Sequence, residues 1–167
     1  MITALILAGD DPRPLAATIS ALVAGVADGV VTDAVVIAAA PAPALEALAD
    51  ASGAALVVHA PGEDPWRAGA RAARHEWLLC LEAGDVPLDG WIRALERFAG
   101  PASAGAPPAL GRLHRRADGI LPRLAATLAA RSSRPRAGDL VHARHLTDGA
   151  RPKVVRLHAS VAREQEP

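Results

Sequence analysis

Four short apolar runs, each separated from the next by a segment of helical periodicity, constrain the fold of this 167-residue chain more than any other feature. Such alternation is typical of βαβ units, in which the strands lie parallel. The length suits one domain with its own core. The sequence therefore predicts a single-domain α/β protein with a mostly parallel sheet flanked by helices. The runs occupy residues 3–8, 34–39, 55–59 and 77–81, and helices are predicted over residues 14–23, 43–51, 66–74 and 91–98.

The second half of the chain has weaker signals. Residues 100–108 are rich in glycine and proline and predict a loop. Beyond it we expect strands over residues 109–116, 139–144 and 154–162, with a helix over residues 120–130. The predicted domain thus spans residues 1–162, with a first half at 1–99, a second half at 109–162, and a loose polar tail at 163–167.

An acidic turn follows the fourth apolar run. Glu82, Ala83, Gly84 and Asp85 come directly after the buried run, and Pro87 prevents the strand from continuing. In open α/β sheets, ligands bind outside the carboxyl ends of the strands, where both carboxylates are expected. Carboxylates bind Mg²⁺ or Mn²⁺, and such an ion neutralises a diphosphate. The alternative is that both acids only solvate a turn.

Composition narrows the classes of function. Eighteen basic residues balance eighteen acidic ones, so no overall positive field favours nucleic acid. The single cysteine, Cys80, lies in an apolar run and predicts a buried thiol. The apolar N-terminus lacks a basic leader and ends at Asp10, Asp11 and Pro12, too early for a signal peptide or membrane helix. We expect a soluble, cytoplasmic protein.

The motifs from Trp66 to Trp91 resemble those of the family 2 glycosyltransferases, which have the GT-A fold. The family's A-A-G-x-x-A-A-R helix, W-L-L-F-L strand, D-A-D turn and P-x-G-W element correspond here to RAGARAAR, WLLCL, EAGD and PLDGW. A weaker match, GDLVHAR at residues 138–144, is similar to the acceptor-side segment G-D-x-G-L-F-V-R-R. The order and spacing of these motifs agree with the family pattern.

The resemblance implies a nucleotide-binding half at residues 1–99 and a reduced acceptor half at residues 109–162. It implies transfer of a hexose from a UDP- or GDP-sugar to an unknown acceptor, with Mn²⁺ or Mg²⁺ as cofactor. The implied metal ligands are Glu82 and Asp85, and the implied nucleotide-binding residues are Asp10, Asp11, Glu82 and Asp85. Asp11 is alternatively a helix N-cap.

Departures from the family pattern concern the acids. Ala38 stands where the family has an aspartate for the uracil or ribose, and a methyl group accepts no hydrogen bond. Gly84 replaces the second aspartate of the acidic turn. The helix that carries the catalytic base in inverting members has no counterpart, so Asp139 and Asp148 are the candidates for the base.

Two other functions stay open. Loss of the family acids favours a non-catalytic binding or scaffold module, and a reduced acceptor half leaves apolar surface that a partner or a second copy would cover. Residues 5–9, LILAG, are similar to the opening of the L-A-G-G loop of nucleotidyltransferases, which is a third hypothesis. Arginines of the second half are candidate contacts for a diphosphate or an anionic acceptor, or form a solvated face: Arg112, Arg115, Arg116, Arg131, Arg134 and Arg136.

Overall fold

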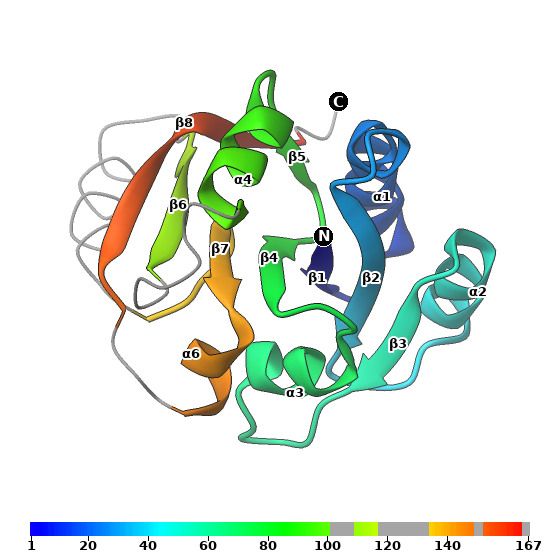
Figure 1. The fold of residues 1–167 in the computed structure, drawn as a ribbon. Helices are drawn as coiled ribbons and strands as arrows, with labels where there is room; N and C mark the ends of the chain where they lie inside the picture. Colours follow the sequence, from blue (N-terminus) through cyan, green and yellow to red (C-terminus); the bar gives the residue numbers. More distant parts are fainter. Residues whose placement is uncertain (101–108, 117–133, 149–151, 165–167) are drawn as a thin grey trace.

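The computed structural model describes residues 1–100, 109–116, 134–148 and 152–164 (Figure 1). The predicted helix at 120–130 and most of the predicted loop at 100–108 lie outside the described residues. Within the described ranges the elements, in chain order, are β1 (Ile2–Leu7), α1 (Pro12–Ala27), β2 (Val31–Ala38), α2 (Pro43–Ser52), β3 (Ala55–Val58), α3 (Pro65–Ala72), β4 (Trp77–Glu82), β5 (Asp85–Pro87), α4 (Trp91–Ala99), β6 (Leu110–Arg115), β7 (Asp139–His142), α6 (Ala143–Thr147) and β8 (Val154–Arg163).

Local sequence explains the boundaries of the first helices. The side chain of Asp11 accepts a hydrogen bond from the backbone N–H of Arg13 and caps α1, as predicted. Asp64 caps α3 in the same way through the N–H of Trp66. At the end of α2, Gly53 adopts a φ of 72°, the left-handed conformation that glycine adopts without strain. The predicted end of α2 is therefore confirmed.

The sheet is mixed, which corrects the prediction of a mostly parallel sheet. Its strand order is β3-β2-β1-β4-β7-β6-β8-β5. The four strands of the first half pair in parallel, as βαβ connections require. From β4 onward, β7 pairs antiparallel with both β4 and β6, and β5 pairs antiparallel with β8, while β6 and β8 are parallel. The parallel prediction was wrong in the second half because β7 runs opposite to both of its neighbours, β4 and β6, and β5 runs opposite to β8.

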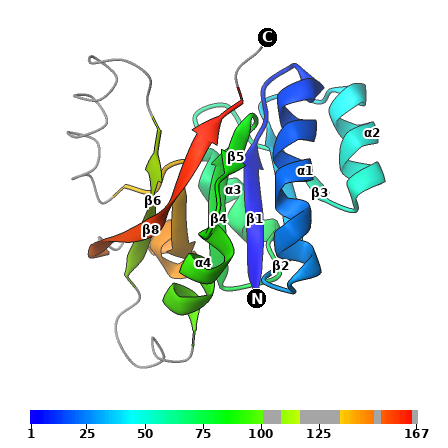
Figure 2. The same ribbon diagram turned by 90° about the horizontal axis from the view of Figure 1, so that it is seen from above.

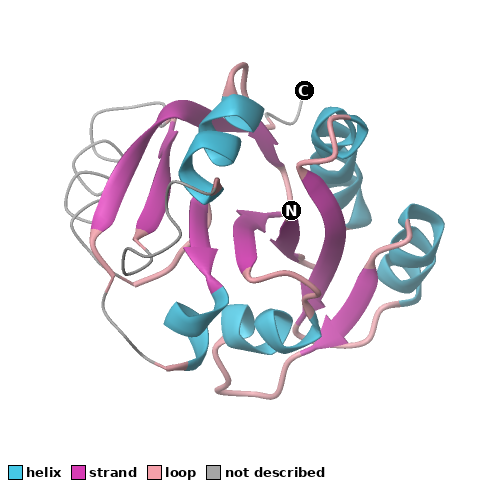
Figure 3. Ribbon diagram, viewed as in Figure 1, coloured by secondary structure: helices cyan, strands magenta, loops and turns pink. Residues whose placement is uncertain are grey.

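Helices cover both faces of the sheet (Figures 2 and 3). On one face α1, α2 and α4 pack through residues such as Leu15, Leu45 and Leu95. On the other face α3 and α6 pack through Trp66 and Leu146. Alternate residues of β4 serve the two cores, because successive strand side chains point to opposite faces: Leu79 and Leu81 on the first, Leu78 and Cys80 on the second.

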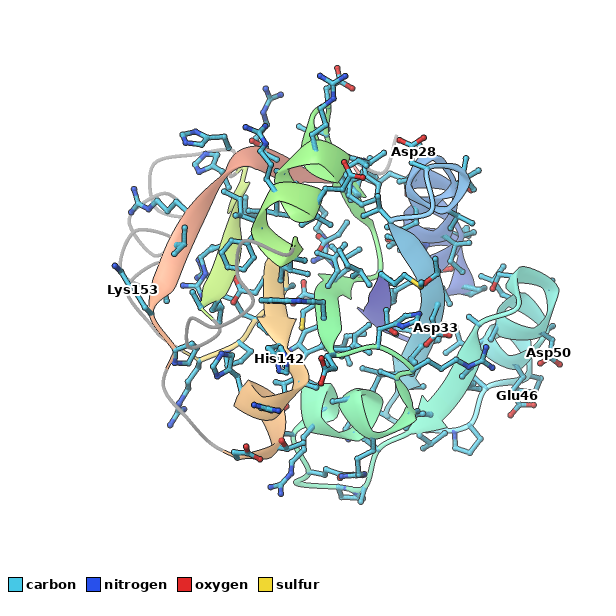
Figure 4. All side chains as sticks on the ribbon, in the orientation of Figure 1. Asp28, Asp33, Glu46, Asp50, His142 and Lys153 are labelled. Carbon is cyan, nitrogen blue, oxygen red and sulfur yellow. The ribbon has the colours of Figure 1, made fainter. Side chains whose placement is uncertain are left out.

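Three boundaries differ from the sequence prediction. A short strand, β5, begins at Asp85 in the acidic turn and includes Pro87, where no strand was predicted. The predicted strand over residues 139–144 ends at His142, whose side chain accepts from the N–H of Arg144 and caps α6 (Figure 4). The last strand continues to Arg163, one residue into the predicted tail, because Arg163 pairs with Asp85. Residues 165–167 lie outside the described residues.

The sheet curls strongly in its second half. Only Ala83 and Gly84 separate β4 from β5 in the chain, yet β7, β6 and β8 lie between them in the strand order. The eighth strand therefore returns close to the end of the fourth, as the ring of strands in Figure 1 shows. This curl brings side chains of β6 and β8 to the acidic turn.

No helix in the described ranges is long and apolar enough to cross a membrane. The large apolar side chains exposed there, including Val23, Val26, Val58 and Val155, are distributed over α1, β3 and β8. These scattered side chains do not indicate a surface for a partner protein or a second copy, and the possible homo-oligomer stays a prediction.

Candidate functional site

The acidic turn lies at the carboxyl edge of β4 and is fixed by two other elements, α1 and the end of β8. The N–H of Gly84 donates to the carbonyl oxygen of Pro14 at 2.9 Å and to Oγ1 of Thr18 at 2.9 Å, both in the first turns of α1. The N–H of Glu164, just after β8, donates to the carbonyl oxygen of Gly84 at 2.7 Å. Gly84 has a φ of +92°, which a residue with a side chain rarely adopts. The turn thus has one well-defined shape.

Both predicted metal ligands are engaged by arginines. Asp85 is fully buried, and its Oδ2 accepts from the N–H of Glu82 at 2.9 Å and from Nη2 of Arg115 at 2.5 Å. Oε2 of Glu82 accepts from Nη1 of Arg163 at 2.8 Å and lies 3.7 Å from Nη1 of Arg115. One guanidinium, that of Arg115 in β6, therefore bridges the two carboxylates.

Burial is the largest influence on the pKa of the Asp85 carboxyl. Desolvation raises the pKa of this carboxyl above its usual value, although the N–H of Glu82 and the charge of Arg115 act in the opposite direction. Oδ1 of Asp85 is buried and has no hydrogen-bond partner in the part of the chain that the structure describes. An unpaired buried oxygen penalises the charged form further.

This raised pKa has a measurable consequence for stability. A folded-state pKa above the usual 3.8 means that folded protein retains the Asp85 proton where the unfolded chain has released it. The contribution of Asp85 to the free energy of unfolding is then largest below the usual pKa, and it falls as pH rises through the raised one. We expect the wild-type free energy of unfolding, minus that of Asp85→Asn, to decrease from about pH 3 to about pH 7. Urea titrations of both proteins at each pH measure it, and a difference that increases with pH would contradict the raised pKa.

The carboxylates as they are held do not fit a divalent ion. The bridging guanidinium of Arg115 takes the position that an ion shared by Glu82 and Asp85 would need. Within the described ranges no three or more His, Cys, Asp or Glu side chains gather into a metal-binding group. Mg²⁺ and Mn²⁺ favour about six oxygen ligands, so two neutralised carboxylates are a poor donor set. An ion would bind here only after the arginines had left.

The first candidate base, Asp139, is held in a buried ion pair. Its side chain is fully buried, and its two oxygens accept from Nε and Nη2 of Arg112, each at 2.7 Å. Oδ2 also accepts from the N–H of Arg136 at 3.0 Å. Burial raises the pKa of Asp139, while Arg112 opposes the shift. Because both oxygens are occupied, the placement does not support Asp139 as the group that takes a proton from an acceptor.

The second candidate base, Asp148, lies at the opposite edge of the sheet. β7 runs antiparallel to β4, with His142 opposite Trp77, and α6 follows β7 directly. Asp148 ends α6, is exposed, and accepts from Oγ1 of Thr147 at 2.8 Å. The structure therefore does not bring Asp148 to Glu82 and Asp85.

The remaining predicted residues surround the carboxyl edge of β1 and β2. Asp10 and Asp11 follow β1, the neighbour of β4, so the structure does bring them to the same edge as the acidic turn. Asp11 caps α1 and pairs with Arg13 at 2.7 Å, and that arginine lowers the pKa of the Asp11 carboxyl. Asp10 is exposed. Ala38 ends β2 and is almost fully buried, so it presents no polar group to a ligand.

Sequence reasoning missed the pairing of the acids with arginines. Arg115 was a candidate phosphate contact, but no pattern linked it to Asp85, 30 residues away. Arg163 was assigned to the tail, although it contacts Glu82 across 81 residues of chain. The only available signal was an arginine that interrupts an apolar strand pattern, as in LGRLHR at Leu110–Arg115.

A shallow groove between α1 and α4 lies apart from these acids. Trp91 lines this groove, and its side chain is buried against Gly25 of α1. The groove contains none of the predicted site residues: it is lined by Ala21, Ala24, Asp28, Pro87, Asp89, Gly90, Trp91, Ile92, Arg93 and Glu96.

No family model and no curated protein matches this sequence. Solved structures do match its fold. Glucosyl-3-phosphoglycerate synthase from Mycobacterium tuberculosis in complex with phosphoglyceric acid superimposes with a TM-score of 0.60 and 16% identity, over 99% of this chain and 72% of the other. The same enzyme with Mn²⁺ and UDP-glucose gives a TM-score of 0.59 and 17% identity, over 99% and 72%. A further structure, described only as a mycobacterial protein, gives 0.59 and 15%, over 99% and 68%.

The fold is therefore that of GT-A-type glycosyltransferases, and the resemblance predicted from the sequence is confirmed at that level. At sequence identities of 15 to 17%, these matches show the fold alone. The chemistry of this chain therefore has to be argued from the residues of its own site.

Proposed function

We propose that this chain binds a nucleotide-diphosphate sugar at the carboxyl edge of β1, β2 and β4 and transfers its hexose to an acceptor. The observation that carries the proposal is the position of the Glu82–Asp85 turn at that edge of a GT-A-type sheet. The diphosphate would lie by the turn, and the nucleoside would extend toward the loops after β1 and β2.

The family 2 assignment belongs to this proposal. It is supported by the motifs of residues 66–91, which the structure distributes over α3, β4, β5 and the start of α4. The cytoplasmic location is a proposal of the same kind, and neither the sugar nor the acceptor is specified by the described side chains.

The comparison structures support a divalent cation for an active protein of this fold, because the synthase was solved with Mn²⁺ and UDP-glucose. If such an ion binds this chain, Glu82 and Asp85 are the residues that would hold it, after release of Arg115 and Arg163. It would stabilise the negative charge of the leaving nucleoside diphosphate.

A non-catalytic binding module is the second candidate function. It is favoured by the placement of the two candidate bases, since Asp139 is occupied by Arg112 and Asp148 lies at the far edge. An inverting transfer requires a carboxylate within hydrogen-bond reach of the acceptor hydroxyl. The two candidate functions share the donor site and differ in turnover, so measurement of both binding and released hexose separates them.

The proposal predicts that Asp10 contributes to nucleotide binding. Asp10→Asn removes a carboxylate acceptor for the nucleoside, and hydrogen bonds to charged groups contribute about 1.5–3 kcal/mol, so we expect binding of UDP or GDP to weaken about tenfold or more. Calorimetric titration of both nucleotides and their sugars measures this. Asp50→Asn, on the exposed side of α2, is the matched control and should leave the Kd unchanged.

Absence of binding by either nucleotide to the wild type would exclude the proposed function. Binding without release of hexose from any nucleotide sugar would favour the non-catalytic module.

A further inference from the structure

Three carboxylates at and beside the acidic turn are each paired with an arginine. Glu82 and Asp85 are neutralised by Arg163 and Arg115. The neighbouring Asp139 is neutralised by Arg112. Arg136 is the additional cation, and it lies on the turn that precedes β7.

The backbone places Arg136 beside the carboxyl end of β4. The N–H of Gly138 donates to the carbonyl oxygen of Cys80 at 2.8 Å, and β7 continues antiparallel to β4 from there. Because the two strands run in opposite directions, residues before Gly138 lie alongside residues after Cys80. The charges that act on Arg136 are those of Arg112, Asp139 and Arg115, and Arg115 in turn contacts Asp85 of the acidic turn.

Arg136 is a cation without a carboxylate of its own. Its side chain is half-buried, and in the described ranges its guanidinium makes no ion pair or side-chain hydrogen bond. Burial lowers its pKa, Arg112 and Arg115 lower it further, and Asp139 acts in the opposite direction. The positive charges of Arg112 and Arg115 repel that of Arg136, and a bound anion would relieve this repulsion.

We name Arg115, Arg136 and Arg163 the arginine cluster. Each of these guanidinium groups has N–H donors beyond those in the contacts described above. A guanidinium has five N–H donors. Arg115 contacts Asp85 and Glu82 through Nη2 and Nη1, and Arg163 contacts Glu82 through Nη1. Arg115 and Arg163 are about one third and more than half exposed, so both reach solvent. Guanidinium forks match the oxygens of phosphate in bidentate pairs.

We propose that the arginine cluster binds the phosphate groups of a nucleotide ligand directly, so that phosphate binding at this edge does not require a divalent cation. This inference rests on the proposed function only for the nucleotide; the phosphate chemistry follows from the cluster itself. Arg115 provides the positive charge between Glu82 and Asp85 that a shared ion would otherwise supply. Arg136 provides a positive charge that no carboxylate pairs with in the described ranges, and this charge attracts the anion.

The experiment uses inorganic pyrophosphate and UDP as probes, each titrated by calorimetry with EDTA and with Mn²⁺. The proteins are the wild type, Arg136→Gln, Glu82→Gln, and Arg93→Gln as a matched control on the exposed face of α4. Far-UV circular dichroism and thermal melts verify that each variant is folded. Gln at position 136 retains the backbone N–H that Asp139 accepts.

We expect pyrophosphate to bind with EDTA present. Arg136→Gln should weaken the affinity for pyrophosphate about tenfold or more, because hydrogen bonds between charged groups are stronger than those between neutral groups. Arg93→Gln should have no effect. Glu82→Gln should leave binding unchanged or tighten it, because it removes a negative charge from beside the phosphate. A metal-mediated site gives the opposite result, with loss of binding in Glu82→Gln.

Three outcomes separate this inference from the proposed function. Pyrophosphate binding in EDTA that depends on Arg136, without any UDP binding, would support the inference and exclude the nucleotide donor. UDP binding only with Mn²⁺ would support the proposed function and overturn the inference. Unchanged pyrophosphate affinity in a folded Arg136→Gln protein would overturn it as well.

Discussion

Replacing Arg112 by methionine should lower the free energy of unfolding by about 3–5 kcal/mol, because the change leaves the buried charge of Asp139 without its partner. The ion pair joins β6 to β7 in the interior, with the Arg112 side chain only 4% exposed and that of Asp139 fully buried. Methionine retains much of the apolar stem of arginine and leaves no large cavity. Urea unfolding monitored by circular dichroism measures the loss.

A double variant distinguishes loss of charge pairing from loss of packing. Arg112→Met with Asp139→Leu removes both charges, and replacement of a buried pair by apolar residues is often neutral or stabilising. We expect the double variant to recover most of the lost stability. Arg97→Met on the exposed face of α4 is the control and should change the free energy of unfolding by no more than about 0.5 kcal/mol. Equal losses in the single and double variants would show that packing, and not charge, dominates.

Replacing Leu140 by alanine should cost about 2–5 kcal/mol, the range for large-to-small changes in a packed core. Leu140 is fully buried in β7, opposite Leu79 of β4 and Gly111 of β6. It therefore lies at the strand that joins the two halves of the sheet. Because one core spans both halves, we expect the whole domain to lose stability together.

Two probes test that cooperativity. Tryptophan fluorescence monitors the first half, where Trp66, Trp77 and Trp91 lie, and hydrogen exchange of the β6 and β8 amides monitors the second. Equal losses of stability by both probes are expected for Leu140→Ala. Val155→Ala, at a partly exposed position of β8, is the control and should change stability little. Loosening of β6 and β8 alone would indicate two separate folding units.

The first half of the fold was predictable because its signals are local. The apolar runs at β1 to β4 and the caps Asp11 and Gly53 each depend on a few consecutive residues, and the structure confirms them. In the second half, the antiparallel placement of β7 depends on pairing with strands distant in the sequence. A four-residue strand has too few residues to specify its partner or direction.

The candidate site was predictable in its position but not in its electrostatics. Glu82 and Asp85 lie at the carboxyl edge of β4, where the strand and turn pattern placed them. Their partners come from β6 and β8, and the antiparallel register of β6 and β7 also sets Asp139 opposite Arg112. No spacing between an acid and an arginine in the sequence indicates such pairs, so the acids were interpreted as free to bind a metal.

The curl of the sheet has a consequence for the order in which the protein assembles. The acidic turn after β4 is held in place by contacts with β8. One of them is the hydrogen bond from Arg163 to Glu82, which are 81 residues apart in the sequence. Contacts between such distant residues form slowly, because closing a long loop costs entropy before any contact compensates. We therefore expect β1 to β4 to form early and the acidic turn to acquire its final shape only when β8 docks. In refolding from urea, ligand binding should then appear no earlier than the slowest folding phase.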